Sequence, residues 1–294
     1  MKCEKCENKA VILKPALCRA HFDEFFLQTT KETIEQFNLF DNKTKICVAV
    51  SGGKDSLALV DVLTRLGYSV EGLFIDEGIA NYREHSVEDI DLFSSQKNIV
   101  VKRTSFVESY GFSLDQAMKT GKVHACTVCG TFRRQLLNKH AQGYDVIATG
   151  HNLDDEAQTI IINLARGNTD LLFRQGPTTQ ETNMFIRRVK PFYFLTEKQI
   201  LTYTILRNIK TQFGECPYAS TSYRVAVREE LNLREQKSPG TKLNIVKSYL
   251  SLKKENNKQQ EFVLQQCATC QQPSQETKCK ACAFKELLAP LIEK

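Results

Sequence analysis

Apolar residues in the middle of the chain occur in short runs that alternate with amphipathic stretches. The runs predict buried strands at residues 46–50, 70–75, 99–101, 145–149 and 185–189. Apolar residues at helical spacing predict helices over residues 57–66, 82–97 and 154–166. Short apolar strands that alternate with helices are typical of an α/β fold with a doubly wound parallel sheet. Ligands of such folds bind at the carboxyl ends of the strands.

The two ends of the chain differ from this alternating middle. Both ends are rich in cysteine, and helical patterns continue from about Thr196 to a polar, linker-like run at residues 253–260. Residues 238–240, Ser-Pro-Gly, interrupt these helices once. We therefore expect four units, namely an N-terminal zinc finger at 1–24, a catalytic α/β domain at 25–215, a helical extension at 216–262 and a C-terminal zinc finger at 263–294.

Composition and charge indicate which partners and which cell compartment suit this chain. The 294 residues carry a formal net charge of +6 and a pI of about 8.7, which favours polyanionic partners without requiring one. The longest apolar runs are too short to span a bilayer, and the residues after Met1 do not resemble a secretory signal. These features predict a cytoplasmic protein without a membrane partner.

Two groups of cysteines have the paired spacing of zinc sites. Grouped cysteines in a reducing cytoplasm indicate metals rather than disulfides. The first group consists of Cys3, Cys6, Cys18 and His21, and the second of Cys267, Cys270, Cys279 and Cys282. We expect one Zn²⁺ in each group, in a module that either contacts RNA or only caps the fold. Cys47 lies inside the first predicted strand and is expected to be a small core residue.

A glycine-rich loop joins the first predicted strand to the first predicted helix. The loop reads Ser51-Gly52-Gly53-Lys54-Asp55-Ser56. Its two glycines let successive N–H groups converge at a helix N-terminus, which is a phosphate-binding arrangement. Ser51, Lys54 and Ser56 add further donors. The Walker spacing is absent, and an ordinary turn is the alternative, but the order strand, loop, helix favours a nucleotide site.

The loop resembles the signature of the PP-loop ATP pyrophosphatase superfamily, which has the adenine nucleotide alpha hydrolase-like fold. The resemblance implies that ATP is cleaved between its α and β phosphates, with an adenylated intermediate, and that Asp55 helps to hold Mg²⁺ or the phosphates. Gly150 to Glu156 match the second motif of the superfamily, in which the glycine backbone approaches the nucleotide. Asp155 is then expected to be catalytic or metal-binding, whereas Asp154 suits a helix cap. Asp76 is expected near the adenine and ribose, with a turn residue as the alternative.

Besides Cys47, three cysteines belong to neither terminal group. Cys126 and Cys129 form a Cys-x-x-Cys pair, and Cys216 lies far along the chain in a Cys-Pro-Tyr sequence. The three could form a catalytic persulfide and then a disulfide, hold an iron–sulfur cluster with one open iron, or bind a structural zinc ion. Zinc in such a role prefers four ligands. The spacing alone does not distinguish between these possibilities.

The whole chain resembles the TtuA/NcsA group of tRNA uridine 2-thiolation enzymes, which includes the eukaryotic cytoplasmic tRNA 2-thiolation proteins. The shared features are terminal zinc fingers around a PP-loop core, the Cys-x-x-Cys-Gly at 126–130 and the Cys-Pro-Tyr at 216–218. The resemblance implies a 4Fe-4S cluster on Cys126, Cys129 and Cys216, whose open iron would hold sulfide or the terminal sulfur of a donor. It also implies that the enzyme adenylates the uridine C2 oxygen, which sulfur then replaces as AMP leaves.

The resemblance extends to partners. It implies tRNA as substrate, a sulfur donor that is either a ubiquitin-like thiocarboxylate protein or free sulfide, and a homodimer. Residues 76–83 and 129–134 resemble the NcsA branch, which implies action on the wobble uridine at position 34 of tRNA, with T-loop position 54 as the alternative. Arg133 occupies a position where the TtuA branch typically has lysine, and its guanidinium could bind phosphate or nucleotide in bidentate fashion.

Basic and aromatic residues near the predicted active edge are candidate RNA contacts. The basic ones are Arg133, Arg134, Lys139, Arg166, Arg174, Arg187, Arg188 and Lys190. Phe173, Phe192 and Tyr193 could stack on bases, although core packing is favoured for each, whereas Tyr218 is the better candidate because it adjoins Cys216. Rival functions are a cluster-free persulfide thiolase, a cytidine 2-thiolase, an RNA-binding protein without turnover and an amide-forming PP-loop ligase.

Overall fold

Five parallel strands form the central sheet of this computed structural model, in the order β5-β4-β3-β6-β7. The strands are β3 (Ile46–Val50), β4 (Val70–Asp76), β5 (Val101–Ser105), β6 (Val146–Ala148) and β7 (Arg187–Val189). The structure describes residues 1–180, 182, 184–211, 214–219, 223–255 and 264–292. The doubly wound α/β fold expected from the sequence is confirmed.

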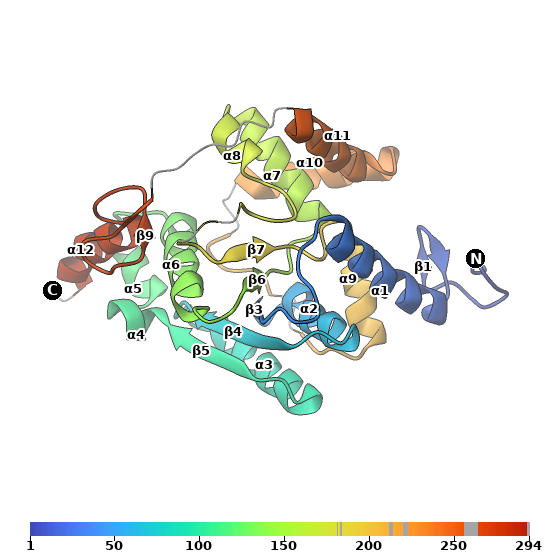
Figure 1. Ribbon diagram of the computed structural model, residues 1–294, viewed down its shortest axis with the longest axis horizontal. Coiled ribbons are helices and arrows are strands. Elements are labelled where there is room, and N and C mark those ends of the chain that lie inside the picture. The colour runs from blue at the N-terminus through green and yellow to red at the C-terminus, as the bar shows by residue number, and fades with distance from the viewer. Residues whose placement is uncertain (181, 183, 212–213, 220–222, 256–263, 293–294) are drawn as a thin grey trace.

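Alternate side chains of the sheet enter two separate cores. Val48 and Phe74 belong to the first core, and Cys47 and Leu73 belong to the second. The first is covered by α1 (Arg19–Gln36), α2 (Lys54–Arg65), α3 (Arg83–Lys97) and α9 (Glu197–Leu206) (Figure 1). The second is covered by α4 (Phe106–Tyr110), α5 (Leu114–Lys119), α6 (Ala125–His140) and α12 (Lys280–Ile292). Cys47 is 1% exposed, which confirms its predicted place in the core.

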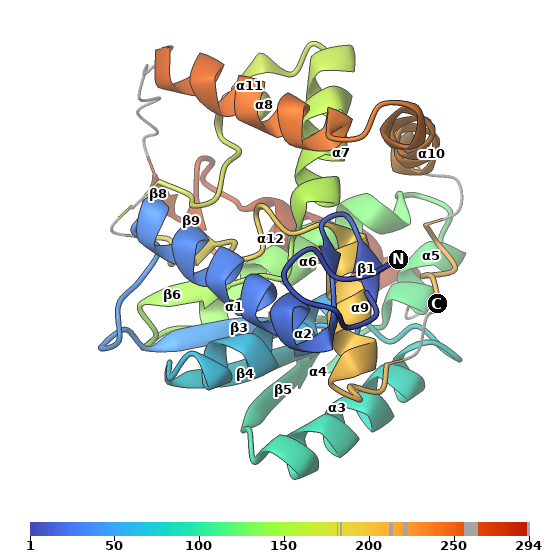
Figure 2. The ribbon, with the colours of Figure 1, turned by 90° about the vertical axis from the view of Figure 1, so that its right-hand side faces the viewer.

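A third core lies beside the sheet. It is formed by α7 (Leu153–Ala165), α8 (Thr169–Phe173), α10 (Tyr223–Lys237) and α11 (Thr241–Glu255). Figure 2 shows α10 and α11 beside α7. The predicted break at residues 238–240 separates α10 from α11. The buried Lys242 ammonium pairs with the Asp154 carboxylate, which fastens α11 to the start of α7.

The strands β4 and β6 differ from their predicted bounds by no more than one residue at either end, and β5 and β7 differ by more. The third predicted strand, 99–101, begins at Val101 in the structure and continues through Lys102 and Arg103. Because β5 is an edge strand, its polar side chains reach solvent, and Lys102 lies 3.1 Å from the Glu71 carboxylate of β4. The strand β7 covers only the last three residues of the predicted 185–189, and the ring of Phe185 is exposed.

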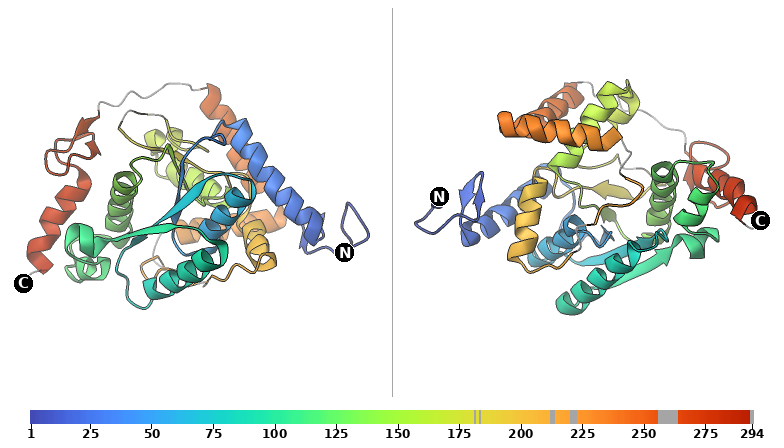
Figure 3. Two further views of the ribbon diagram at one scale, coloured as in Figure 1. Left: turned by 60° about the horizontal axis from the view of Figure 1, so that its bottom comes forward. Right: turned by 180° about the vertical axis from the view of Figure 1, so that it is seen from behind.

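The two cysteine-rich ends carry small hairpins. They are β1 (Ile12–Leu13) with β2 (Ala16–Leu17), and β8 (Gln265–Gln266) with β9 (Pro273–Ser274). The N-terminal and C-terminal modules lie at opposite ends of the molecule (Figures 1 and 3). Most of the predicted linker at residues 253–260 lies outside the described residues. No helix in the described ranges has the length and apolar character required to cross a membrane.

Candidate active site

The glycine-rich loop turns sharply between β3 and α2. Gly52 has a φ of +81°, and a Cβ at this position would lie 2.8 Å from the Cβ of Ser86 on α3. Both the backbone conformation and the close approach of α3 therefore require glycine here. The Ser56 hydroxyl donates to the Gly53 carbonyl at 2.9 Å and accepts from the Ser51 amide at 3.1 Å. Ser56 therefore holds the loop in shape at the N-terminus of α2, where a helix end can bind phosphate.

Lys54 is held between two carboxylates at the start of α2. Its ammonium lies 3.1 Å from Asp55 Oδ2 and 2.9 Å from Glu197 Oε1. Burial alone would lower the pKa of Lys54, but Asp55 and Glu197 reverse this effect and raise it. Glu197 begins α9, far along the chain, and was not among the predicted site residues. Its only sequence signal was a position one residue after the cap Thr196.

The two superfamily motifs meet at Asn152. The Asn152 amide nitrogen Nδ2 donates to Asp55 Oδ1 at 3.3 Å, and its backbone N–H donates to Asp155 Oδ2 at 3.2 Å. Asp55 and Asp155 therefore lie on either side of one residue. Burial raises the pKa of both carboxyls, that of Asp155 to about 6, and the Asp55 charge contributes to the Asp155 shift. A Cβ on Gly150 would lie 2.8 Å from the Asp55 carbonyl carbon, so glycine is required for this approach.

Asp154 and Asp76 have structural partners. The Asp154 carboxylate accepts from the Glu197 backbone N–H at 2.8 Å in addition to its pairing with Lys242. Asn152, rather than Asp154, is the N-cap of α7. Asp76 accepts from the Gly78 backbone N–H at 2.7 Å, which is the geometry of the turn residue considered as an alternative.

A cavity of about 520 Å³ opens beside the glycine-rich loop. Its lining comprises residues of the loop, of the turn before α3 and α3 itself, and of the segment around Cys216, namely Ser51, Gly52, Gly53, Ala80, Asn81, Tyr82, His85, Ser86, Asp89, Gly214, Glu215 and Pro217. The volume suits a nucleotide-sized ligand. The cavity therefore runs from the glycine-rich loop to the neighbours of Cys216.

The structure brings the three central cysteines together. Cys126 and Cys129 lie in the first turns of α6, with Cys126 exposed and Cys129 half-buried. Cys126 Sγ lies 4.0 Å from the Tyr218 carbonyl oxygen, two residues after Cys216. Burial raises the pKa of Cys129 to about 11, and Glu77 and Cys216 contribute to that shift. Burial also raises the pKa of Cys216, with a contribution from Cys126, so the three thiols are close enough to affect one another.

Arg133 lies beside this cysteine group. Its Nε is 3.2 Å from Glu77 Oε1, and Cys129 Sγ is 3.9 Å from the same oxygen. Glu77 is 0% exposed, and its other oxygen pairs with Arg83. Sequence reasoning did not select Glu77 as a site residue, although it directly follows the second strand, where ligand-binding residues of this fold occur.

The terminal groups gather their ligand atoms as expected for single metal ions. The four ligand atoms of Cys3, Cys6, Cys18 and His21 lie within 4.8 Å of one another, as do those of Cys267, Cys270, Cys279 and Cys282. Backbone N–H groups point at some of the sulfurs, as from Lys5 to Cys3 at 3.4 Å. Each group could hold one tetrahedral ion.

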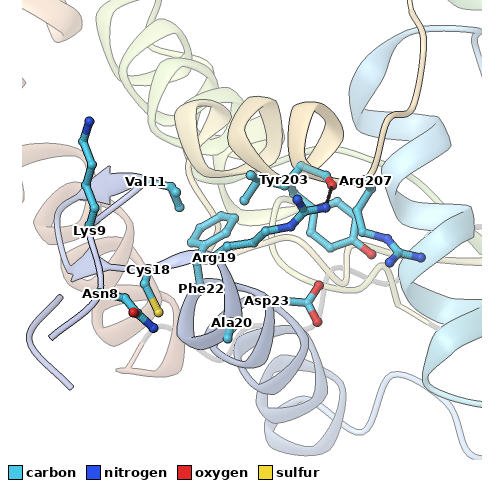
Figure 4. A pocket seen from close by; sticks show the side chains of 11 residues that line it. Asn8, Lys9, Val11, Cys18, Arg19, Ala20, Phe22, Asp23, Tyr203 and Arg207 are labelled. Atoms are coloured by element: carbon cyan, nitrogen blue, oxygen red, sulfur yellow. Dashed lines mark hydrogen bonds between the residues drawn. The ribbon is translucent and has the colours of Figure 1, made fainter. Parts of the chain in front are cut away.

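The N-terminal module packs on the α/β core around a cavity of about 520 Å³ (Figure 4). Arg19 donates from its guanidinium to the Leu206 carbonyl of α9 at 2.8 Å, the dashed line in the figure. Asp23 of α1 binds Arg65 of α2 with both carboxylate oxygens at 2.6 Å. These contacts attach the module to the core.

Several predicted RNA contacts are instead used within the protein. Phe192 and Tyr193 are 0% exposed, which confirms the core packing favoured for them, and the Tyr218 hydroxyl donates to Asp115 at 2.6 Å. Arg187 donates to the backbone carbonyls of residues 38 and 39, and Lys190 pairs with Glu156 at 2.7 Å. Phe173 is half-buried, so it remains a candidate.

The C-terminal module is joined to the helix that carries Cys126 and Cys129. Gln135 of α6 donates from Nε2 to Cys279 Sγ at 3.2 Å and to Cys270 Sγ at 3.3 Å. The Tyr110 hydroxyl donates to Gln135 Oε1 at 2.6 Å and fixes the orientation of the amide. Outer hydrogen bonds of this kind stabilise thiolate ligands and hold them in place.

If the C-terminal cysteine group binds zinc as expected from its spacing, replacing Gln135 with leucine will weaken that site selectively. We expect a chelator to remove zinc from this site about ten times faster in the variant than in the parent. Residues that hydrogen-bond to metal ligands contribute about that factor to metal affinity. The measurement is the time course of zinc release followed with a colorimetric chelator, where one of two phases should accelerate. Gln28→Leu, which changes an exposed residue of α1 bonded to Glu32, is the matched control. An unchanged rate of zinc release from Gln135→Leu would show that the hydrogen bonds of Gln135 do not stabilise this site.

Comparisons with known proteins agree with this site. A family model described as a PP-loop domain matches residues 24–235. A tRNA-5-methyluridine(54) 2-sulfurtransferase of Thermus thermophilus is 37% identical over 289 residues, covering 96% of this chain and 90% of that protein. A cytoplasmic tRNA 2-thiolation protein 1 of Drosophila sechellia is 36% identical over 297 residues, covering 96% of this chain and 86% of that protein.

A solved structure is also similar over most of the chain. The U34-tRNA thiolase NcsA from Methanococcus maripaludis, determined with its 4Fe-4S cluster, has a TM-score of 0.77 and 28% identity, covering 86% of this chain and 88% of that one. The sequence matches extend well beyond the PP-loop domain to nearly the whole chain. The chain belongs to the PP-loop family, within the TtuA/NcsA group of tRNA 2-thiolation sulfurtransferases.

Proposed function

We propose that this enzyme is an ATP-dependent tRNA uridine 2-sulfurtransferase that acts on the wobble uridine at position 34. The observation that supports this most is the cavity shared by the phosphate-binding loop and the segment around Cys216. A site that converts a carbonyl oxygen into a leaving group needs a nucleophile close by. Three grouped thiols beside an adenylating site suit the replacement of that oxygen by sulfur.

The proposed reaction has two steps. The uridine C2 oxygen attacks the α phosphorus of ATP, and the bond to pyrophosphate breaks. Hydrosulfide, which is either free in solution or released when water cleaves the C–S bond of a thiocarboxylate donor and leaves a carboxylate, then attacks C2. The C2–O bond breaks, AMP leaves with the oxygen and one proton passes to solvent. Sulfur keeps the oxidation state of sulfide throughout the reaction, so no oxidant or reductant is needed. Lys54 and the N-terminus of α2 would stabilise the charge on the departing pyrophosphate.

The central cysteines suit a 4Fe-4S cluster better than a single zinc ion. Each cysteine of such a cluster binds a different iron, which keeps the sulfurs farther apart than around one ion. Among the described residues, only the two terminal groups have their ligand atoms within 4.8 Å of one another. Cys126, Cys129 and Cys216 would hold the cluster, and when bound it would supply an iron without a protein ligand that can carry sulfur. Asp55 and Asp155 would hold Mg²⁺.

Arg134 and Arg188 are the strongest candidates for tRNA phosphate contacts. Arg188 donates to the Arg134 carbonyl at 3.2 Å, and a Cβ on Gly130 would lie 3.1 Å from the Arg134 guanidinium. Within the described ranges neither side chain has a carboxylate partner within 4.0 Å. Burial, and then the charge of Arg134, lower the pKa of Arg188 to about 10. A pair of guanidiniums without a carboxylate partner among the described residues, one of them on the helix that carries Cys129, suits a phosphate ligand.

The double variant Arg134→Gln, Arg188→Gln will bind tRNA more weakly and with less dependence on salt. Loss of two phosphate contacts should reduce the slope of log affinity against log salt concentration by about two. Filter binding at several salt concentrations measures this slope. Arg103→Gln is the matched control, because Arg103 pairs with Asp91 at the opposite edge of the sheet. If Arg103→Gln reduced the affinity and the salt slope equally, the effect would not come from specific contacts of Arg134 and Arg188 with tRNA phosphates.

The test of the proposed function is anaerobic thiolation of unmodified tRNA with Mg·ATP and sulfide, followed by mass spectrometric mapping of 2-thiouridine. Sulfur at position 34 is the expected result. Sulfur at position 54 would overturn the wobble assignment and select the second candidate, which the Thermus thermophilus relative favours through its name. Sulfur on cytidine, or no tRNA-dependent AMP formation, would contradict the proposal as a whole.

A further inference from the structure

Glu77 is a fully buried carboxylate between two arginines from different helices. Its side chain is 1% exposed, that of Arg83 on α3 is 8% exposed, and that of Arg133 on α6 is 38% exposed. One carboxylate oxygen pairs with Arg83 Nε, and the other lies 3.2 Å from Arg133 Nε. Removing one partner of a buried charge greatly lowers the stability of a protein. Glu77, Arg83 and Arg133, here called the triad, therefore form a rigid unit.

The triad touches both halves of the candidate active site. Arg83 donates to the Ser51 carbonyl oxygen of the phosphate-binding loop at 3.0 Å. At the other end, the Glu77 oxygen that pairs with Arg133 lies 3.9 Å from Cys129 Sγ. A continuous chain of polar contacts thus runs from Ser51 through Arg83 and Glu77 to Cys129.

The surroundings leave the triad little freedom to move. The Arg83 guanidinium lies over the ring of Phe74 at 5.6 Å and over that of Tyr82 at 5.2 Å. The Glu77 carbonyl accepts from the Leu114 backbone N–H at 2.7 Å, which ties it to the start of α5. A shift of the loop at Ser51 would therefore be transmitted to Glu77 rather than absorbed by a flexible side chain.

We propose that Glu77 is a positioning residue that couples the nucleotide half of the site to the cysteine half. Through Arg83 it fixes the phosphate-binding loop, and through Arg133 it fixes the cation beside Cys129. Arg133 uses Nε for Glu77, so its terminal nitrogens are directed by the pair and can contact the uridine or its phosphate. The two steps of the reaction then occur on one uridine held in one geometry. This inference rests on the proposed function.

The test is the ratio of AMP formed to 2-thiouridine formed in Glu77→Gln, which keeps the size of the side chain and removes its charge. The parent should form about one AMP per thiolated uridine. We expect the ratio in the variant to rise about tenfold or more. Adenylation of the uridine continues, but sulfur transfer fails because the reacting groups are misplaced, and water then hydrolyses the adenylated uridine to uridine and AMP. A purely structural defect would lower both products in proportion. Glu71→Gln is the matched control, since Glu71 lies on β4, the strand that Glu77 directly follows, and pairs with Lys102 without touching either half-site.

A second measurement does not depend on turnover. In the cluster-loaded parent and in Glu71→Gln, a non-hydrolysable ATP analogue with Mg²⁺ should change the electron paramagnetic resonance spectrum of the reduced cluster. In Glu77→Gln the cluster and analogue should both bind, and the change should be lost. If this variant does not fold, Arg83→Lys keeps the charge but cannot reach Ser51 and Glu77 together, and it should behave in the same way.

The outcomes separate the inference from the function beneath it. A parent that makes no thiolated tRNA would overturn the proposed function. A parent that thiolates tRNA, with the same product ratio and the same spectral change in Glu77→Gln, would overturn the coupling role alone. Loss of cluster or nucleotide binding in both variants would also overturn it, because Glu77 and Arg83 would then serve stability.

Discussion

The double variant Cys126→Ala, Cys216→Ala will lose about four irons per chain while it keeps its zinc. The reason is that these two cysteines, from α6 and from a loop 90 residues away by their numbers (216 − 126), meet at one place beside Cys129. Two of the three expected ligands are thereby removed, and the terminal groups are untouched. We expect the thiolation activity to fall below detection. Iron, acid-labile sulfide and zinc analyses of anaerobically prepared protein, with absorption spectra, give the answer.

Cys47→Ala is the control for this experiment. Cys47 is a buried core thiol that belongs to none of the three cysteine groups, and burial holds its pKa far above the usual range. Its loss should change neither iron nor zinc content. Zinc without iron in both the parent and the double variant, together with intact thiolation in the parent, would contradict the cluster and support a persulfide route instead.

Local patterns predicted those parts of the molecule that are built from contiguous residues. The glycine-rich loop, the Asn152 to Glu156 turn and the terminal cysteine groups are each short segments whose spacing reflects a local geometry. The parallel sheet followed from the alternation of strands and helices. The edge strand β5 was misplaced because its polar residues, Lys102 and Arg103, hide the strand pattern.

Contacts between distant segments could not be predicted in this way. Glu77 follows a strand and resembles a solvent-exposed turn residue, and its burial depends on how α3 and α6 pack. Glu197 reaches Lys54 only because α9 packs against α2. The position of basic residues near the predicted active edge also overestimated the RNA surface, since the Arg187 guanidinium donates to backbone carbonyls in the structure. A residue type indicates what a side chain can do, whereas packing decides which neighbour it meets.

Asp155→Asn will reduce tRNA-dependent AMP formation at saturating ATP by about a hundredfold or more, the usual effect of removing a group that stabilises transition-state charge. Asp155 and Asp55 flank Asn152 with their carboxyls, and two such oxygens are the ligands that Mg²⁺ prefers. Because burial raises the Asp155 pKa to about 6, its proton competes with Mg²⁺ below that pH. The Mg²⁺ affinity of the parent should therefore fall between pH 7 and pH 5, and the variant should lose most of this dependence.

The neighbouring residue supplies the control. Asp154→Asn breaks the buried pairing with Lys242 and leaves the Mg²⁺ candidates in place, so it should cost about 3 kcal/mol of stability. Its folded fraction should retain the Mg²⁺ dependence of the parent. Titrations of AMP formation with Mg²⁺ at pH 5, 6 and 7, beside thermal melts, compare the two variants. If Asp154→Asn lost the Mg²⁺ dependence and Asp155→Asn kept it, the metal would have to be assigned to the other carboxylate, and the Asn152 pairing would be only a helix cap.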